Sequence, residues 1–278
     1  MRIDTLPFRL LAAAGFAVAL TGDALAGMGQ PSPWQLGMQT PAAIGAEAIH
    51  DFHDLLLWII TVIVLFVLAL LIYVIVRFSE TRNQTPSRTT HNSLLEVAWT
   101  LVPVLILVVI AVPSFRLLKA QLVIPTPDVV VKATGHQWYW SYEYPADQGG
   151  FSFDSNLAAD KQPRLLAVDN ELVVPVDKIV KVQVTAADVI HAFAMPSFGL
   201  KIDAIPGRLN ETWFKADKEG VFYGQCSLIC GQNHAFMPIM IRVVSQEAYT
   251  AWLADAKKKF AANPSGPIKL ADRDAITR

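Results

Sequence analysis

The only two cysteines of the 278-residue chain lie in one short segment, residues 224–238. The soft donors of this segment are Cys226, Cys230, His234 and Met237. Thiolate, imidazole and thioether together form a ligand set that suits copper best among the biological metals. A further imidazole, His191, lies thirty-five residues before the first cysteine. These residue types and their spacing predict a copper site for electron transfer.

The cysteine segment is also compatible with a disulfide or with a different metal. Two cysteines in an exported protein usually form a disulfide, and Cys226 and Cys230 are close enough in sequence to be bridged. Zinc is less favoured, because its cysteine pairs usually sit closer and occur with a second pair. A mononuclear blue-copper site uses one cysteine, two histidines and a weak axial methionine. This segment has one thiolate too many for that, but two thiolates can bridge two copper ions.

The N-terminus has the features of a secretory signal peptide. Arg2 and Arg9 precede an apolar run, residues 10–20, and residues 24–26 form a cleavage site of the Ala-x-Ala type. Eleven apolar residues are too few to span a bilayer, which needs about 20. We therefore expect residues 1–26 to be a signal peptide and the chain to be exported.

Two longer apolar runs follow, and each can cross the hydrocarbon core of a membrane. Residues 55–76 carry no charged side chain. Residues 95–116 contain a second apolar run, residues 97–115, which is interrupted by Pro103 and has Pro113 near its end. Proline inside a membrane helix is tolerated where neighbouring protein satisfies the freed backbone groups. A buried hairpin of a soluble protein seldom has two such runs, so we expect two transmembrane helices.

The charges of the flanking segments predict the orientation of these helices. The connecting loop, residues 77–94, carries three arginines and one glutamate, whereas residues 27–54 contain no lysine or arginine. Arg116 and Lys119, beyond the second helix, argue mildly in the opposite direction. The signal peptide decides between them. We expect a cytoplasmic loop, a periplasmic segment 27–54 and a periplasmic C-terminal domain, in the inner membrane of a bacterium.

Residues 127–245 consist of short runs rich in β-branched and aromatic residues. Residues 131–134 and 181–185 alternate with period two, as half-buried strands do. Many short strands in a domain of this size are typical of a Greek-key sandwich or barrel. The expected fold class is therefore a membrane-anchored all-β protein with a two-helix hairpin ahead of the β domain. In the C-terminal segment, residues 246–278, an amphipathic helix over 248–260 should precede a tail.

Composition excludes several other function classes. Thirteen acidic and ten basic residues over 128–245 leave an excess too small to require a basic partner. Nothing resembles a nucleic-acid footprint, a glycine-rich phosphate loop or a spaced Ser/His/Asp group. No Cys-x-x-Cys-His motif is present, so no haem is attached covalently and the electron donor should be a separate protein.

Five segments of the chain resemble subunit II of the haem-copper cytochrome c oxidases. They are residues 99–103, 135–144, 165–170, 191–210 and 224–238. The aromatic string at 135–144 and the cysteine segment are the most specific of them, and the similarity covers nearly all of the mature chain. The resemblance implies a cupredoxin-like domain with a binuclear copper centre (CuA). Such a centre accepts electrons from cytochrome c and passes them to haem in subunit I, where oxygen reduction is coupled to proton pumping.

The copper ligands of this family can be carried over to the sequence residue by residue. Cys226 and Cys230 would bridge the two copper ions. His191 and His234 would each bind one ion, and Met237 would be a weak axial ligand. A closed ligand set of this kind has no open position for bond chemistry, so the domain should carry electrons only.

Leu228, between the two cysteines, departs from the family pattern. The sixth copper contact in the family is a backbone carbonyl at this position, which leucine still provides. The family usually has a glutamate here, and its carboxylate helps to hold a magnesium ion at the interface with subunit I. Because a leucine side chain cannot bind a hard cation, we expect this magnesium site to be absent or weak, unless another oxygen or a water takes its place.

The resemblance also implies roles for residues outside the copper site. Trp138 matches the tryptophan at which the family receives electrons from cytochrome c. Glu96, at the start of the second helix, matches an acid at the mouth of a proton-uptake channel in subunit I. A ring of acids would attract a basic cytochrome, and its candidates are Glu143, Asp147, Asp154, Asp169 and Asp188. Asp188 is the strongest of these because it lies three residues from His191.

Other proteins that share part of this pattern fit less well. The related quinol oxidase subunits lack the copper ligands, and nitrous oxide reductase has a similar cysteine segment on a far longer chain without paired membrane helices. A structural disulfide protein remains one alternative. The main alternative is a membrane-tethered periplasmic protein that binds or delivers copper, although delivery needs an open and exchangeable site.

Overall fold

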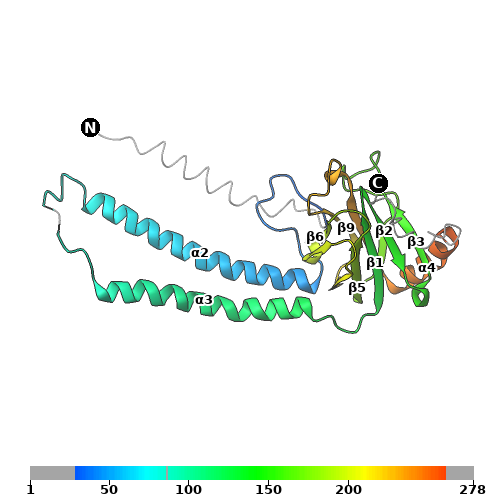
Figure 1. Ribbon diagram of the computed structural model, residues 1–278, viewed down its shortest axis with the longest axis horizontal. Helices are drawn as coiled ribbons and strands as arrows, with labels where there is room; N and C mark the ends of the chain where they lie inside the picture. Colours follow the sequence, from blue (N-terminus) through cyan, green and yellow to red (C-terminus); the bar gives the residue numbers. More distant parts are fainter. Residues whose placement is uncertain (1–28, 86, 261–278) are drawn as a thin grey trace, which may run out of the picture. The chain divides into compact units, whose positions relative to one another are not determined.

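The computed structural model describes residues 29–85 and 87–260. They divide into a helical unit, residues 48–123, and a β unit that combines residues 29–47 with residues 124–260. Figure 1 shows the two long helices and the strands of the β unit. The expected signal peptide, residues 1–26, and the tail after residue 260 lie outside the described residues.

The two long helices are α2 (Ile44–Arg77) and α3 (Ser93–Leu122), and both are long and apolar enough to cross a membrane. Their apolar side chains are exposed in the isolated chain, as expected of side chains that face lipid or other subunits. Both helices extend beyond the predicted spans 55–76 and 95–116. The uncharged run marks only the part that suits the hydrocarbon core, whereas helical hydrogen bonding continues into the polar residues that flank it.

The ends of α3 show why it starts and stops where it does. The Asn92 side chain caps the helix and accepts hydrogen bonds from the backbone N–H groups of Leu94 and Leu95 at 3.1 and 3.2 Å. Asparagine is among the most favourable residues at this position. Lys119 lies in the last turn, where a positive charge complements the helix dipole.

The β unit is a sandwich of two five-stranded sheets. The first sheet has the order β3-β2-β1-β5-β8, with β1 (Val129–His136), β2 (Tyr139–Tyr144), β3 (Phe151–Ser155), β5 (Ile179–Ala186) and β8 (Asn210–Lys215). The second has the order β4-β10-β9-β6-β7, with β4 (Leu172–Pro175), β6 (His191–Met195), β7 (Leu200–Ala204), β9 (Gly220–Cys226) and β10 (Pro238–Val244). The pairs β1/β5 and β4/β10 are parallel and the other pairs are antiparallel. The predicted fold class, two apolar helices followed by a cupredoxin-like β domain, is confirmed.

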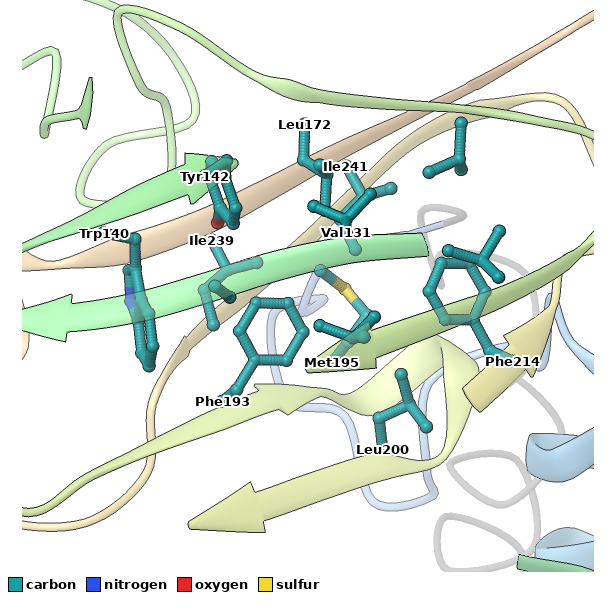
Figure 2. Packing of buried hydrophobic residues seen from close by; sticks show 14 of the residues in the cluster. Val131, Trp140, Tyr142, Leu172, Phe193, Met195, Leu200, Phe214, Ile239 and Ile241 are labelled. Carbon is teal, nitrogen blue, oxygen red and sulfur yellow. The ribbon is translucent and has the colours of Figure 1, made fainter. Parts of the chain in front are cut away.

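The hydrophobic core of this unit lies between the two sheets. β1 and β5 bury every second residue, as the alternation in the sequence predicts. Figure 2 shows Trp140 and Phe193, from opposite sheets, side by side in this core. Their rings meet edge to face with centroids 5.4 Å apart, and Trp140 also lies against the His191 ring at 6.1 Å. The core therefore reaches the predicted ligand His191.

One further helix and three short turns complete the β unit. The helix α4 (Gln246–Phe260) lies against β3 and β4, and its Trp252 contacts the rings of Tyr144 and Phe151. This agrees with the amphipathic helix predicted for 248–260. The short 3-10 turns are η1 (Ala146–Gln148), η2 (Pro196–Phe198) and η3 (His234–Phe236).

Residues 29–46, which we call the N-terminal strap, belong to the β unit although they precede the first apolar run. Ala42 and Ala43 are fully buried in its core. Ala43 forms a bridge with Ala216, and the backbone N–H of Tyr223 donates to the carbonyl of Gly29 at 2.8 Å. The strap is therefore an integral part of the domain that carries the cysteines.

Candidate metal centre

The predicted copper ligands meet at one end of the second sheet. His191 is the first residue of β6 and Cys226 is the last residue of β9. Antiparallel pairing of these strands, with Phe193 opposite Cys226, places the start of β6 beside the end of β9. The loop from Cys226 to β10 then supplies the remaining donors, Cys230, His234 and Met237.

The donor atoms form a chain of short contacts. The two cysteine Sγ atoms are 3.9 Å apart. His191 Nδ1 lies 3.9 Å from Cys226 Sγ, and His234 Nδ1 lies 3.3 Å from Cys230 Sγ. Met237 Sδ is 3.5 Å from Cys230 Sγ. The two thiols are therefore central, and each histidine lies next to a different thiol.

Leu228 lies at the edge of this cluster and contributes its backbone. Its carbonyl oxygen is 3.3 Å from Cys226 Sγ. The structure thus brings the carbonyl together with the five side-chain donors, as the resemblance implies. The leucine side chain adds no polar atom.

Burial and chemistry decide what this cluster can hold. His191, Cys226, Cys230 and Met237 are 0%, 6%, 4% and 1% exposed. Both cysteines are free, and their sulfur separation of 3.9 Å is well beyond the about 2 Å of a disulfide bond. The donors are two thiols, two imidazoles and a thioether, which is a soft set that fits copper and provides no carboxylate for a hard cation.

Asp188 fixes the orientation of His191. The His191 Nε2–H donates to Asp188 Oδ1 at 2.8 Å, which leaves Nδ1 directed at Cys226. Carboxylate partners of this kind orient metal-binding histidines and set their tautomer. Burial alone would lower the pKa of His191, but its hydrogen bonds with Cys226 and Asp188 outweigh burial and raise that pKa.

The pKa values of the two thiols are shifted in opposite directions. Burial works to raise the pKa of Cys226, but its hydrogen bonds with the His191 ring and with the backbone of Ala192 lower that pKa overall. Burial raises the pKa of Cys230, and the neighbouring charge of Cys226 raises it further. Cys226 is therefore the more readily ionised of the pair.

Trp138 lies at the tip of the β1–β2 hairpin, next to the cysteine segment. His136 pairs with Tyr139 across this hairpin, and their rings stack at 4.5 Å, so Gln137 and Trp138 form a two-residue turn. Trp138 is half-buried. Its ring lies so close to Gly231 that a Cβ there would be 3.1 Å from Trp138 Cζ2.

The five acids that the sequence suggests for docking occupy different places. Asp188 and Asp154 lie near the hairpin tip, where they accept hydrogen bonds from the backbone N–H of Gln137 at 2.7 Å and from the Ser141 hydroxyl at 2.6 Å. Burial lowers the pKa of His136, and the charges of these two carboxylates oppose that shift. Glu143 is in an ion pair with Lys132 at 3.2 Å. Asp147 is in η1, beyond the other end of β2.

The carboxylate of Asp169 is engaged by backbone groups of neighbouring segments. It accepts hydrogen bonds from the backbone N–H groups of Asn156 and Asn170 at 2.8 and 2.7 Å. Glu96 belongs to the helical unit, where it lies in the first turn of α3. A carboxylate in this turn is favoured by the helix dipole.

Sequence reasoning missed two residues that shape the site. Gly135 lets β1 approach His191 closely: a Cβ at this glycine would lie 2.9 Å from His191 Cδ2. A glycine inside a strand is a known signal of such close approach. The side-chain amide of Gln137 donates to the carbonyl of Cys230 at 2.8 Å, a contact between distant segments that no local pattern announces.

Comparison with known proteins places the chain in a family. The profile "Cytochrome C oxidase subunit II, periplasmic domain" matches residues 129–244, and the corresponding transmembrane-domain profile matches residues 31–117. A probable cytochrome c oxidase subunit 2 of Rickettsia bellii is 52% identical over 84% of this chain and 88% of its own length. The cytochrome c oxidase subunit 2 of Cereibacter sphaeroides is 46% identical over 88% of each chain.

A solved structure is also similar to part of the chain. It is the periplasmic domain of subunit II of the cytochrome oxidase of Bradyrhizobium japonicum, with 68% sequence identity and a TM-score of 0.49, covering 50% of this chain and 99% of that one. The chain belongs to the cytochrome c oxidase subunit II family.

Proposed function

We propose that the chain is the electron-accepting subunit of a terminal cytochrome c oxidase and that its soft donor cluster holds two copper ions. The cluster itself is the observation that carries this proposal: two buried thiols 3.9 Å apart, each with its own histidine. When bound, the copper pair would supply a one-electron carrier between cytochrome c and the haem of subunit I. Oxygen reduction and proton pumping would belong to subunit I.

The residues of the chain would support electron transfer by holding the ligands still. Cys226 and Cys230 would supply the thiolates that hold the metal, and Asp188 keeps the imidazole of His191 in one tautomer. Both strands that end at the cluster, β6 and β9, are packed into the core. A rigid and dry ligand cage changes little when its charge changes, which keeps the energetic cost of reorganisation low.

The alternative of a copper-delivery protein fits this geometry less well. Delivery requires ligands that a partner can reach and replace. His191 is fully buried, and both cysteines are less than a tenth exposed. The cage therefore favours a resident metal.

Replacing Cys230 with serine is expected to abolish the copper pair, because this thiol contacts Cys226, His234 and Met237. We expect electron paramagnetic resonance of the purified complex to show one electron shared over two copper nuclei before the change and to lose this pattern after it. Met237→Leu should keep the pair with an altered spectrum. The matched control Met240→Leu, in β10 outside the cluster, should leave the spectrum unchanged. A single-copper pattern in the unmodified complex, or a Cys226–Cys230 disulfide without copper, would refute the binuclear site.

Magnesium is expected to be weakly held or absent at the interface with subunit I, because Leu228 has no oxygen in its side chain. Introducing a carboxylate by Leu228→Glu should raise the magnesium retained by the purified complex, measured by elemental analysis after gel filtration. Leu228→Gln is the neutral control and should retain less. Stoichiometric magnesium in the unmodified complex would contradict this prediction.

The chain is a membrane protein with an extramembrane C-terminal domain. We propose that the membrane is the bacterial inner membrane and that the domain is periplasmic, after removal of residues 1–26. The three arginines of the loop 77–94 support a cytoplasmic loop. The inclusion of residues 29–47 and 124–260 in one β unit supports placing both flanks of the helix pair on the same side.

The proposed partners follow from these surfaces. The exposed apolar sides of α2 and α3 would contact lipid, subunit I and the other oxidase subunits. Cytochrome c would bind over Trp138, with Asp154 and Asp188 as the nearest acids and Glu143, Asp147 and Asp169 further out. Glu96 would lie at the mouth of a proton channel.

A further inference from the structure

We propose that Gln137 is a positioning residue for electron uptake, because its side chain fastens the Trp138 turn to the backbone of a thiolate ligand. This inference rests on the proposed role of Trp138 as the residue that receives electrons. It assigns Gln137 a role that is distinct from docking and from binding copper.

The first contact joins the turn to the cysteine segment. Gln137 Nε2 donates to the backbone carbonyl of Cys230 at 2.8 Å, across 93 positions of sequence. The turn itself comprises only Gln137 and Trp138, between the paired residues His136 and Tyr139. A hydrogen bond from one of its two residues therefore sets the distance between the turn and the ligand segment.

The second contact shows how closely the two segments approach. A Cβ on Gly231 would lie 3.1 Å from both Gln137 Nε2 and Trp138 Cζ2. Both side chains therefore lie against the same part of the backbone, the peptide that joins Cys230 to Gly231. Gly231 has a φ of +123°, a conformation that side chains disfavour. The glycine, the amide and the indole form one packed junction.

The third contact holds the other side of the turn. The backbone N–H of Gln137 donates to Asp188 Oδ2 at 2.7 Å, and the other oxygen of this carboxylate accepts from His191 Nε2 at 2.8 Å. The main chain of Gln137 is therefore tied to the His191 side of the cluster. Its side chain alone provides the tie to Cys230, so a side-chain substitution removes one tie and keeps the other.

These contacts predict a separation between docking and electron transfer. Gln137 is uncharged, so long-range attraction of a basic cytochrome should not depend on its amide. The rate of transfer, in contrast, depends on how closely the Trp138 ring is held to the Cys230–Gly231 peptide. Small losses of positioning of this kind can cost about tenfold to a hundredfold in rate.

The test uses the complete oxidase complex with Gln137→Glu, which keeps the length of the side chain but removes the amide donor that faces the Cys230 carbonyl. Gln246→Glu, on the exposed start of α4, adds the same charge elsewhere and is the matched control. The measurement is the first-order rate constant for copper reduction by photoreduced cytochrome c at saturating cytochrome concentration. We expect it to fall about tenfold in Gln137→Glu and to stay unchanged in Gln246→Glu.

Two further readouts distinguish positioning from general damage. The added carboxylate should leave the concentration of cytochrome c at half-saturation unchanged or lower it, and the paramagnetic spectrum should keep its two-copper pattern. Hydrogen exchange of the backbone amides over 230–234, measured by mass spectrometry, should become faster. Gln137→Asn, whose amide is one methylene shorter, should slow the reduction as well.

Different outcomes refute the proposed function and the positioning role of Gln137. If cytochrome c does not reduce the copper centre of the unmodified complex, the proposed function fails and takes this inference with it. If the unmodified complex is reduced and Gln137→Glu is reduced at the same rate, the positioning role alone is overturned. A Gln137→Glu complex that has lost its two-copper pattern would also overturn it, because Gln137 would then act on the ligands themselves.

Discussion

Replacing Gly224 with alanine is expected to destabilise the β unit strongly. Gly224 lies in β9, directly before the Gln225–Ala194 pairing with β6. A Cβ at this position would lie 2.0 Å from the backbone oxygen of Ala194, and neither backbone can move aside without separating the two strands. We expect a loss of more than about 3 kcal/mol in the free energy of unfolding. Because β6 begins at His191 and β9 ends at Cys226, the proposed copper ligands would separate too.

The loss of stability is measured by thermal unfolding of the detergent-solubilised chain, followed by circular dichroism. The copper content of the same protein is measured separately. Gly37→Ala is the matched control, since a Cβ at Gly37 meets nothing within 4 Å. We expect this control to change stability by less than about 0.5 kcal/mol. A Gly224→Ala protein that unfolds at the same temperature as the unmodified chain would show that β6 and β9 tolerate the added methyl group.

Replacing Gly135 with alanine is expected to displace His191 while the fold survives. The new Cβ would lie 2.9 Å from His191 Cδ2 and 3.0 Å from Cγ. The ring is fully buried and is held from the other side by Asp188, so it can move only by giving up its place beside Cys226. Disturbance of a ligand's support typically costs about 10-fold to 100-fold in metal affinity. We expect a loss of this size, measured by copper retention during dialysis against a chelator.

The control for this change is Gly45→Ala, for which the nearest atom is the carbonyl oxygen of Phe198 at an ordinary 3.5 Å. It should retain copper as the unmodified chain does. Circular dichroism should show that Gly135→Ala keeps its β structure. If the paramagnetic spectrum of the proposed copper pair were unchanged in Gly135→Ala, the added methyl group would not have displaced the His191 ring.

The parts of the site that could be predicted are those that a short stretch of sequence encodes. Four donors lie within one loop of twelve residues, Cys226–Met237, so their proximity follows from chain connectivity. The apolar runs of α2 and α3 can be recognised in the sequence because they lack charged residues over a length that spans a membrane. The alternation in β1 and β5 likewise indicates which face of each strand is buried.

The parts that could not be predicted depend on backbone groups brought together by the fold. The side-chain amide of Gln137 donates to the backbone carbonyl of Cys230, and any residue at position 230 would have offered the same acceptor. The sequence suggests Asp188 as a docking acid because it is close to His191. Its carboxylate is in fact engaged by His191, Gln137 and Val189, which sequence spacing cannot reveal. The N-terminal strap has no strand pattern, because it is held by backbone hydrogen bonds, by the buried Ala42 and Ala43, and by side-chain hydrogen bonds from Ser197 and Lys218.

The strap makes the β unit a discontinuous domain. Its first part is synthesised before α2 and its second part after α3, and the strap pairs with β9 through Tyr223 and Gly29. The strap therefore has no partner until both helices and most of the strands have been made. If the second helix did not bring the chain back across the membrane, the strap and its sheet would be on opposite sides of the bilayer. Completion of the copper domain thus reports that the helix pair has been inserted correctly.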